Sequence, residues 1–333
     1  MKLEEILHQA EALNASDIHL SVGQVPFFRI DGELSSVIAS TINALEMETI
    51  VAGILSKQDY LFLTEHGEVD CAWQWSAKPI KRCRINAYRQ NGTYAMAIRL
   101  LPQDIPACDQ LGIPRSLQQL ITAKSGLLLC TGATGSGKST TLASLVAEIN
   151  RTRAVHILTM EDPVEYRYAS GKALIHQREI GRDTENFASA LKSALREDPD
   201  VLLVGELRDA ASMAITLTAA ETGHLVLATM HTKDSISCIN RFLHLPQQEI
   251  IRLQLAETLL AVSSQRLLPK AEGRGRIAAF EVLVINDALR NLIREGKTQQ
   301  LASYMETGGR FGMRTMSDAV NELRRKREIG CEK

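Results

Sequence analysis

Alternating hydrophobic and polar positions near the N-terminus predict a small antiparallel sheet. Residues 17–22 and 27–30 have the pattern of its first strands. Asp31-Gly32 then predicts a tight turn into a third strand at 33–38. Ahead of these strands, apolar residues recur at helical spacing, which predicts an N-terminal helix that contains Leu3, Ile6, Leu7, Ala10 and Leu13.

A second hairpin is marked more clearly. Residues 82–90 alternate, Asn91-Gly92 is favoured in a two-residue turn, and residues 93–101 return. Because a two-residue turn sets which positions of a hairpin face each other, Arg84 falls directly opposite Arg99 on one face of the sheet.

Two guanidinium groups at opposed positions repel each other, at a cost of roughly a few tenths of a kcal/mol or more. An anion between them removes that cost, and guanidinium groups bind phosphate oxygens well. We therefore expect Arg84 and Arg99 to contact the phosphates of a nucleotide. The alternative is that both arginines splay into solvent and form a general basic surface with Arg82.

Prolines interrupt the chain after this hairpin, at Pro102, Pro106 and Pro114. They predict a linker over 101–115 between a first domain at 1–100 and a second domain at 116–333. In the second domain, short apolar runs alternate with helical patterns, which is typical of the buried parallel strands of an α/β domain. These runs lie at 126–130, 155–159, 201–204 and 225–229.

The first apolar run leads into GATGSGKS, which matches the phosphate-loop pattern G-x-x-x-x-G-K-[ST] in full. Its glycines let backbone N–H groups turn toward an anion, and the helix that follows adds its dipole. Lys138 is expected to reach the β- and γ-phosphates of ATP, and Ser139 to ligate Mg²⁺. The residues expected to bind nucleotide are Gly132, Ala133, Thr134, Gly135, Ser136, Gly137, Lys138, Ser139 and Thr140.

Acidic residues follow two of the other predicted strands. Glu161-Asp162 ends one strand and Glu206 follows another, so both acids should lie near the phosphate loop, at the carboxyl edge of the sheet. A usual phosphate-loop protein carries Asp where this chain has Gly205, which favours Glu206 as the residue that activates water. The alternatives are a salt bridge from Glu206 to Arg208, a structural role for Glu161, and a turn role for Asp162.

Two histidines flank the predicted strand at 225–229. His231 follows the strand, so it should lie on the nucleotide side, where it could contact the γ-phosphate. His224 precedes the strand and should lie at the opposite edge. The alternative for each histidine is a purely structural role.

The charge of the chain limits its partners. It has 38 Lys and Arg against 39 Asp and Glu, and this net charge of −1 provides no field that would gather nucleic acid. No apolar run reaches the roughly 18 residues of a membrane span. None of the six cysteines has the C-x-x-C spacing of a zinc site. Together with an acidic N-terminal stretch unlike a signal peptide, these features predict a cytoplasmic protein.

Several motifs in fixed order resemble those of the secretion and type IV pilus ATPase superfamily, and within it the PilT-like retraction ATPases. They are SDIHL at 17–21, RCRINAYRQN at 82–91, GATGSGKST at 132–140, HILTMEDPVEY at 156–166, LREDPDVLLVGELRD at 195–209, TGHLVLATMHT at 222–232 and ALRNLIREGK at 288–297. The resemblance covers nearly the whole chain.

The resemblance implies an α/β fold, with a PAS-like α+β domain followed by a RecA-like ATPase domain. It also implies a homohexameric ring at the cytoplasmic face of the inner membrane, in contact with the pilus platform protein and with the membrane itself only peripherally. A paralogous pilus ATPase is a further possible partner.

The same resemblance assigns roles to single residues. Glu161 falls in the acidic box, where it could reach Mg²⁺ through water, and Glu206 falls in the Walker B segment. His224 and His231 fall in the histidine box. Arg84 and Arg99 match an arginine pair that contacts phosphates.

The expected function is ATP hydrolysis that powers pilus retraction. Two alternatives remain open on sequence alone: an accessory ring subunit that acts with a principal motor, and a motor for pilus assembly or type II secretion. The extra N-terminal domain and four-cysteine module of assembly motors are not found in this sequence, which favours retraction.

Overall fold

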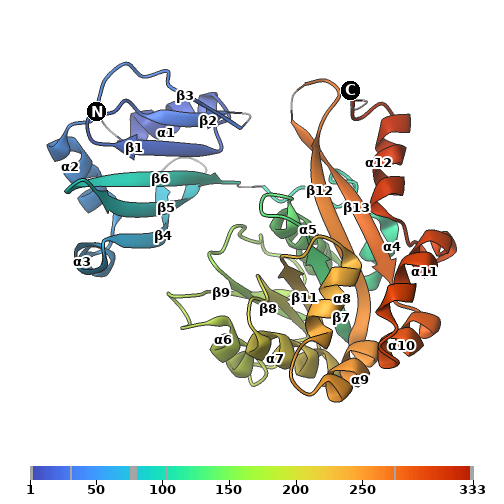
Figure 1. Cartoon of the computed structure of the whole chain (residues 1–333). Coiled ribbons are helices and arrows are strands. Elements are labelled where there is room, and N and C mark those ends of the chain that lie inside the picture. The colour runs from blue at the N-terminus through green and yellow to red at the C-terminus, as the bar shows by residue number, and fades with distance from the viewer. Residues whose placement is uncertain (1–2, 31, 76–80, 103, 274, 331–333) are drawn as a thin grey trace. The chain divides into compact units, whose positions relative to one another are not determined.

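The computed structural model describes residues 3–30, 32–75, 81–102, 104–273 and 275–330. The chain divides into two compact units, residues 1–104 and residues 105–333 (Figure 1). The predicted turn residue Asp31 lies outside the described residues. Every residue predicted to form the nucleotide site lies inside them.

The first unit contains an antiparallel sheet with the strand order β3-β2-β1-β6-β5-β4. The third strand is shorter than predicted and ends at Ser35, while the second hairpin has its predicted extent within one residue. The strands are β1 (Asp17–Ser21), β2 (Phe27–Ile30), β3 (Glu33–Ser35), β4 (Glu68–Trp75), β5 (Lys81–Gln90) and β6 (Thr93–Leu101).

The two faces of this sheet differ in polarity. One face packs into a core with the buried sides of α1 (Leu3–Ala12), α2 (Ala44–Ile54) and α3 (Lys57–His66). Ile18, Ile85 and Ile98 lie side by side on this face in neighbouring strands, and all three are fully buried. The next position along each strand points to the other face, so Arg84 and Arg99 lie there. The register of β5 and β6 confirms that these two arginines oppose each other.

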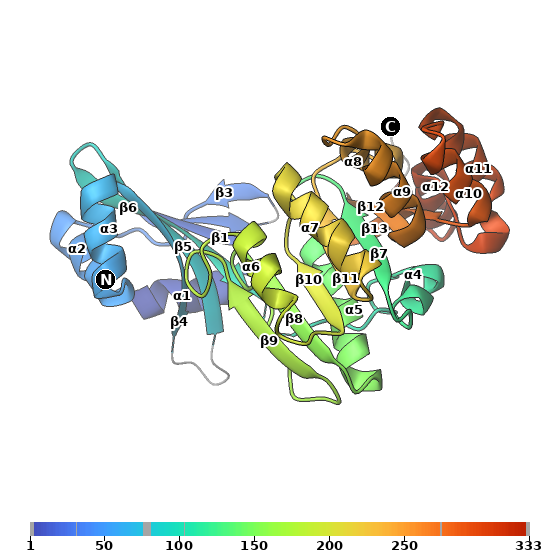
Figure 2. The same cartoon turned by 90° about the horizontal axis from the view of Figure 1, so that it is seen from below.

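The second unit is a sheet with helices on both faces (Figure 2). Its strand order is β13-β12-β7-β11-β10-β8-β9, parallel throughout except for β13, which pairs antiparallel with β12. The strands are β7 (Gly126–Thr131), β8 (His156–Glu161), β9 (Leu174–Glu179), β10 (Val201–Val204), β11 (Leu225–Met230), β12 (Leu259–Pro269) and β13 (Arg276–Val284).

The central strands of this sheet are buried on both faces, which explains why they form continuous apolar runs in the sequence. In β7, Leu127 and Leu129 point into one core while Leu128 and Cys130 point into the other. The first core is covered by α6 (Phe187–Ala194), α7 (Ala210–Glu221), α8 (Ser235–Leu243) and α9 (Gln248–Thr258), and the second by α4 (Arg115–Leu120) and α5 (Lys138–Thr152).

The C-terminal part of this unit is helical, with α10 (Asp287–Arg294), α11 (Leu301–Thr307) and α12 (Met316–Arg325). Among the described residues, no helix has the length and apolar character needed to cross a bilayer. The four predicted strands all formed, and their carboxyl ends lie along one edge of the sheet because they are parallel. That edge carries the candidate site.

Candidate active site

The phosphate loop joins β7 to α5 and packs against β12. Gly132 has a φ of 141° and Gly137 a φ of 90°, conformations that side chains rarely adopt. A Cβ on Gly132 would also lie 2.5 Å from the carbonyl oxygen of Gln265 and 2.8 Å from the Ser136 hydroxyl. The loop therefore requires glycine at Gly132 for two reasons: the positive φ angle, and the close approach of the β12 backbone at Gln265.

Polar groups inside the loop suit an anion. The Lys138 side chain is buried, and its Nζ donates hydrogen bonds of 2.9 Å to the carbonyl oxygens of Gly132 and Ala133. Burial lowers the pKa of Lys138, so a negative charge beside it would be stabilising. The Ser136 hydroxyl is buried and has no hydrogen-bond partner within the described part of the chain, and Ser139 is exposed at the start of α5. These groups fit the oxygens of a bound phosphate.

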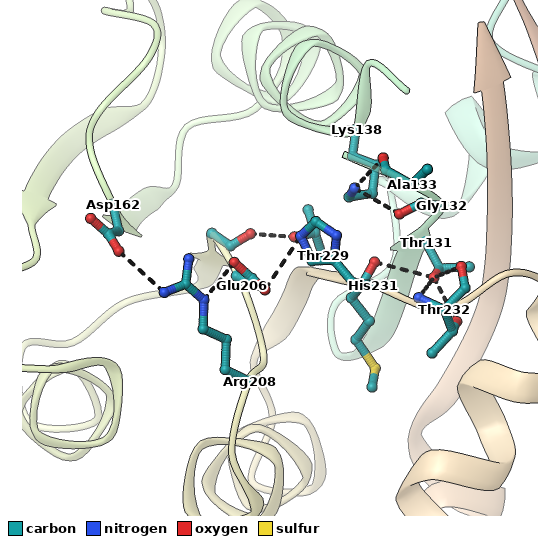
Figure 3. Close-up of polar contacts among 12 residues, drawn as sticks. Thr131, Gly132, Ala133, Lys138, Asp162, Glu206, Arg208, Thr229, His231 and Thr232 are labelled. Carbon is teal, nitrogen blue, oxygen red and sulfur yellow. Dashed lines mark hydrogen bonds and ion pairs between the residues drawn. The ribbon is translucent and has the colours of Figure 1, made fainter. Parts of the chain in front are cut away.

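Glu206 and His231 meet beside this loop, as predicted from their places after β10 and β11 (Figure 3). His231 Nε2 lies 3.3 Å from Glu206 Oε1, and Arg208 Nε donates to Glu206 Oε2 at 2.7 Å. The salt bridge that was the alternative for Glu206 is therefore present. Burial lowers the pKa of His231, and the charge of Lys138 lowers it further, so His231 is mostly neutral at pH 7.

Asp162 lies on the other side of Arg208. Its Oδ2 is 3.7 Å from Arg208 Nη1, so the guanidinium lies between two carboxylates, those of Asp162 and Glu206 (Figure 3). Asp162 therefore contributes a negative charge to the site, and its role is not confined to the turn before Pro163. Arg208 remains 61% exposed, and an exposed ion pair holds its partners only weakly.

Hydroxyl groups of threonines form hydrogen bonds between the ends of β7, β10 and β11, close to Glu206 and His231. The Thr131 hydroxyl accepts a hydrogen bond of 2.9 Å from the backbone N–H of Thr232 and lies 3.1 Å from the Met230 carbonyl oxygen. The Thr229 hydroxyl donates to the carbonyl oxygen of Gly205. The ends of β7, β10 and β11 are therefore bonded directly to one another, which holds the segment that carries His231.

Glu161 is the last residue of β8 and is buried. The Thr159 hydroxyl donates to its Oε1 at 2.6 Å, and the Gln177 amide donates to the same oxygen at 3.3 Å. Burial raises the pKa of Glu161 to about 7 despite these hydrogen bonds. A carboxyl group with a pKa near 7 can exchange a proton under physiological conditions, which is frequent in active sites.

Gly205 allows β10 to approach β8 closely. The Gly205 N–H donates to the Met160 carbonyl oxygen at 2.7 Å. A Cβ on Gly205 would lie 3.1 Å from that oxygen and 3.2 Å from the Cα of Glu161. Any side chain here would require its neighbours to shift by a few tenths of an ångström, so the close approach favours glycine over the usual Asp.

The raised pKa of Glu161 predicts a pH-dependent effect on stability. The unfolded carboxyl has a pKa near 4.5 and the folded one near 7, so the neutral form stabilises the fold fully below pH 4.5. This contribution is lost as the pH rises through 7, at a cost on the order of 3 kcal/mol. We expect Glu161→Gln, without nucleotide, to raise the melting temperature at pH 8 by roughly 5 °C and to change it little at pH 5.

Thermal melting of the full chain at both pH values, followed by circular dichroism, tests this expectation. Glu148→Gln is the matched control, because Glu148 is on the same unit and pairs with Arg151 on the surface. An equal change for Glu161→Gln at pH 5 and pH 8 would contradict the raised pKa.

The remaining sequence candidates lie elsewhere. His224 precedes β11, and its Nδ1 is 2.9 Å from the carbonyl oxygen of Ala219, so it caps α7 at the edge opposite the phosphate loop. Arg84 and Arg99 belong to the first unit. Arg84 Nε lies 3.0 Å from both carboxylate oxygens of Asp70, and Arg99 Nε donates to Asp17 at 2.8 Å.

These two carboxylates change the argument about the arginines. Each guanidinium is neutralised by its own aspartate, so the pair is stable without a shared anion. Burial alone would raise the pKa of Asp17, but its hydrogen bonds from Arg99 and Ser16 hold that pKa below the ordinary value. The two arginines therefore need no bound phosphate to lie opposite each other, and the resemblance alone supports their contact with nucleotide.

Two glutamines were not identified from the sequence. Gln265 of β12 is buried behind the phosphate loop, where its Oε1 accepts a hydrogen bond of 2.8 Å from Thr141. Gln177 of β9 reaches Glu161, as described above. Neither belongs to a motif at a recognisable spacing, and both act through strands that the sequence pattern did not reveal.

Known proteins are similar to this chain in sequence and in fold. A family model described as type II/IV secretion system protein matches residues 1–325. The uncharacterized protein YggR of Escherichia coli is 45% identical over 323 residues, which cover 96% of this chain and 97% of that protein. The type IV pilus retraction ATPase PilT of Pseudomonas aeruginosa is 39% identical over 326 residues, or 97% of this chain and 94% of that protein.

One solved structure covers nearly the whole fold. A crystal structure of the pilus retraction motor PilT with bound ADP superposes with a TM-score of 0.90 at 42% identity. It covers 99% of this chain and 95% of the PilT chain.

Proposed function

The chain belongs to the type II/IV secretion system protein family, and on that premise we propose that it is an ATP-hydrolysing motor subunit that powers type IV pilus retraction. One observation carries the ATPase assignment: Lys138, Glu206 and His231 converge at a phosphate loop whose Ser136 hydroxyl is buried without a partner in the described chain. The PilT relatives supply the retraction assignment.

We assign the triphosphate of ATP to the phosphate loop. Backbone N–H groups from Gly132 to Thr140 would surround the β-phosphate, and Lys138 would reach toward the γ-phosphate. Ser139 would hold Mg²⁺ directly and Glu161 through water, and the ion would neutralise charge that develops on the phosphate oxygens. The exposed Ser139 hydroxyl and the buried Glu161 carboxyl are both oxygen ligands of the kind Mg²⁺ prefers.

Glu206 is the residue we assign to the attacking water. Its carboxylate would accept a proton as the water oxygen bonds to the γ-phosphorus, while the bond to the β-phosphate oxygen breaks and ADP leaves. The neutral His231 would donate a hydrogen bond to Glu206 or to the γ-phosphate, and either contact orients the reacting groups.

For the assembly, the proposal rests on the resemblance to the pilus ATPases and not on the geometry of this chain. We propose a homohexameric ring at the cytoplasmic face of the inner membrane, where it would act on the pilus platform protein, with a paralogous pilus ATPase as a further partner. Arg84 and Arg99 would then leave Asp70 and Asp17 to contact phosphates. An accessory role is disfavoured because Lys138, Ser139, Glu161 and Glu206 are all intact.

Turnover as a function of protein concentration tests the ring. The ATPase rate per subunit should rise with assembly, as followed by analytical ultracentrifugation. Arg84→Ala with Arg99→Ala should lower the rate several-fold without unfolding the first unit, because the two arginines lie on the face of the sheet opposite its core and their loss removes the ion pairs with Asp70 and Asp17. A rate per subunit that stays constant at all concentrations would refute a site that depends on assembly. Normal turnover in the double variant would refute a role for the two arginines at the phosphates.

Deletion of the gene in the organism that carries it distinguishes retraction from assembly. A cell without a retraction motor should keep its surface pili and lose their shortening, as seen by fluorescence microscopy of labelled pili. Loss of the pili themselves would instead identify an assembly motor.

A further inference from the structure

Gln177 occupies the middle of β9, a strand that no sequence motif assigns to the site. Its register partner on β8 is Thr159. Side chains two residues apart on a strand share a face, so Thr159 and Glu161 point the same way. Gln177 lies opposite them, within reach of the Glu161 carboxylate.

The amide nitrogen of Gln177 makes two hydrogen bonds at once. It donates to Glu161 Oε1 at 3.3 Å and to the carbonyl oxygen of Tyr166 at 2.8 Å. An amide –NH₂ has two hydrogens, so both bonds are satisfied without competition. Gln177 therefore joins the carboxylate to the backbone five residues further along the chain.

Tyr166 extends this connection to the phosphate loop. Its hydroxyl lies 2.9 Å from the Thr140 hydroxyl, next to Ser139, and the ring is buried. Thr140, Tyr166, Gln177 and Glu161 thus form one continuous series of contacts. Tyr166 and Glu161 are buried and Thr140 and Gln177 are half-buried, so these contacts link the start of α5 to the carboxylate.

Glu161 retains capacity for a further contact. Its carboxylate accepts hydrogen bonds from Thr159 and from Gln177, both at Oε1. A carboxylate has about four acceptor positions, so capacity remains for water or a hydrated cation. The two donors fix the direction in which the remaining positions point.

We propose that Gln177 is a positioning residue for hydrolysis, which holds the Glu161 carboxylate in the orientation that the reaction needs. The inference rests on the proposed ATPase function and on Glu161 acting in it. Gln177 contacts Glu161 and the Tyr166 backbone, neither of which is assigned to the phosphates, so we expect its loss to lower kcat and to leave ATP binding nearly unchanged. Removing a hydrogen bond to a carboxylate in a site of this kind typically costs about tenfold or more.

The first test is Gln177→Leu, which keeps the size of the side chain and removes both hydrogen bonds. We expect kcat to fall about tenfold, with KM for ATP and the binding of a fluorescent ADP analogue unchanged within about twofold. Gln118→Leu is a closely matched control, because the Gln118 amide also donates to a carboxylate, Asp109, and to a carbonyl oxygen, that of Ile113, away from the site. The control should keep wild-type kcat.

A double-mutant cycle separates positioning from general support of the fold. If Gln177 acts through Glu161, then Gln177→Leu should change kcat by less than about twofold in a Glu161→Gln background. An equal loss in both backgrounds, or a loss matched by Gln118→Leu, would assign Gln177 a structural role and overturn the proposal.

The outcomes also separate this inference from the proposed function. Normal kcat in Gln177→Leu, with turnover abolished by a change at Glu206, would refute the role of Gln177 alone. No turnover in the wild-type protein at any concentration would refute the proposed function itself.

Discussion

Lys138→Ala should abolish ATP hydrolysis, with a loss of turnover of about 10³-fold or more, and should weaken ATP binding by about 10²-fold. The Lys138 ammonium is buried above the loop, 2.9 Å from the carbonyl oxygens of Gly132 and Ala133. It is the one cation that the loop places among the expected phosphate oxygens, and alanine offers no replacement. A phosphate-release assay and titration with a fluorescent ATP analogue measure the two effects.

The fold should tolerate this change. Because burial lowers the pKa of Lys138, its charge is held at a cost in the absence of a bound anion, so removing it should not lower the melting temperature. Lys192→Ala is the control, since Lys192 is exposed on α6 and should keep wild-type turnover. Turnover within about tenfold of wild type in Lys138→Ala would refute the assignment of the loop as the catalytic phosphate site.

Glu206→Gln should separate binding from chemistry. The amide keeps the size of the side chain but cannot accept a proton from water, so turnover should fall by about 10²- to 10⁴-fold. ATP binding should stay within a few-fold of wild type, because Glu206 is assigned to the water rather than to the phosphates. Rapid mixing under single-turnover conditions shows whether the loss is in the chemical step.

The competing general base is Glu161, whose pKa of about 7 suits proton transfer at neutral pH. Normal hydrolysis in Glu206→Gln, together with loss in Glu161→Gln, would transfer the assignment to Glu161. Glu148→Gln serves again as the control, since Glu148 pairs with Arg151 on the surface of α5.

Local patterns were sufficient for the parts of the fold that depend on local physics. The strands β7, β10 and β11 are buried on both faces, so they appear as continuous apolar runs. The opposition of Arg84 and Arg99 followed from a two-residue turn, which sets the register of its own hairpin. The phosphate loop was recognisable because its glycines, lysine and serine must be contiguous.

The features missed depend on contacts between distant segments. The edge strand β9 has exposed and half-buried positions and only one buried residue, its last, so no apolar run marks it, and Gln177 was missed with it. Asp17 pairs with Arg99 because β1 lies next to β6, although 82 residues separate the two side chains along the chain. No spacing rule predicts that neighbour, and so the arginines were expected to need a phosphate.

The close packing around Gly205 limits which amino acids can replace it. The commoner phosphate-loop arrangement places Asp at that point, but the strand ends leave a Cβ only 3.1 Å from a backbone oxygen and 3.2 Å from a backbone carbon. Neither atom belongs to a flexible side chain that could turn aside. An acid at this position, in an evolving lineage or in an engineered variant, would require the ends of β10 and β8 to move apart by a few tenths of an ångström. The commoner acid would therefore come with a change in the spacing of the two strand ends that carry Glu161 and Glu206.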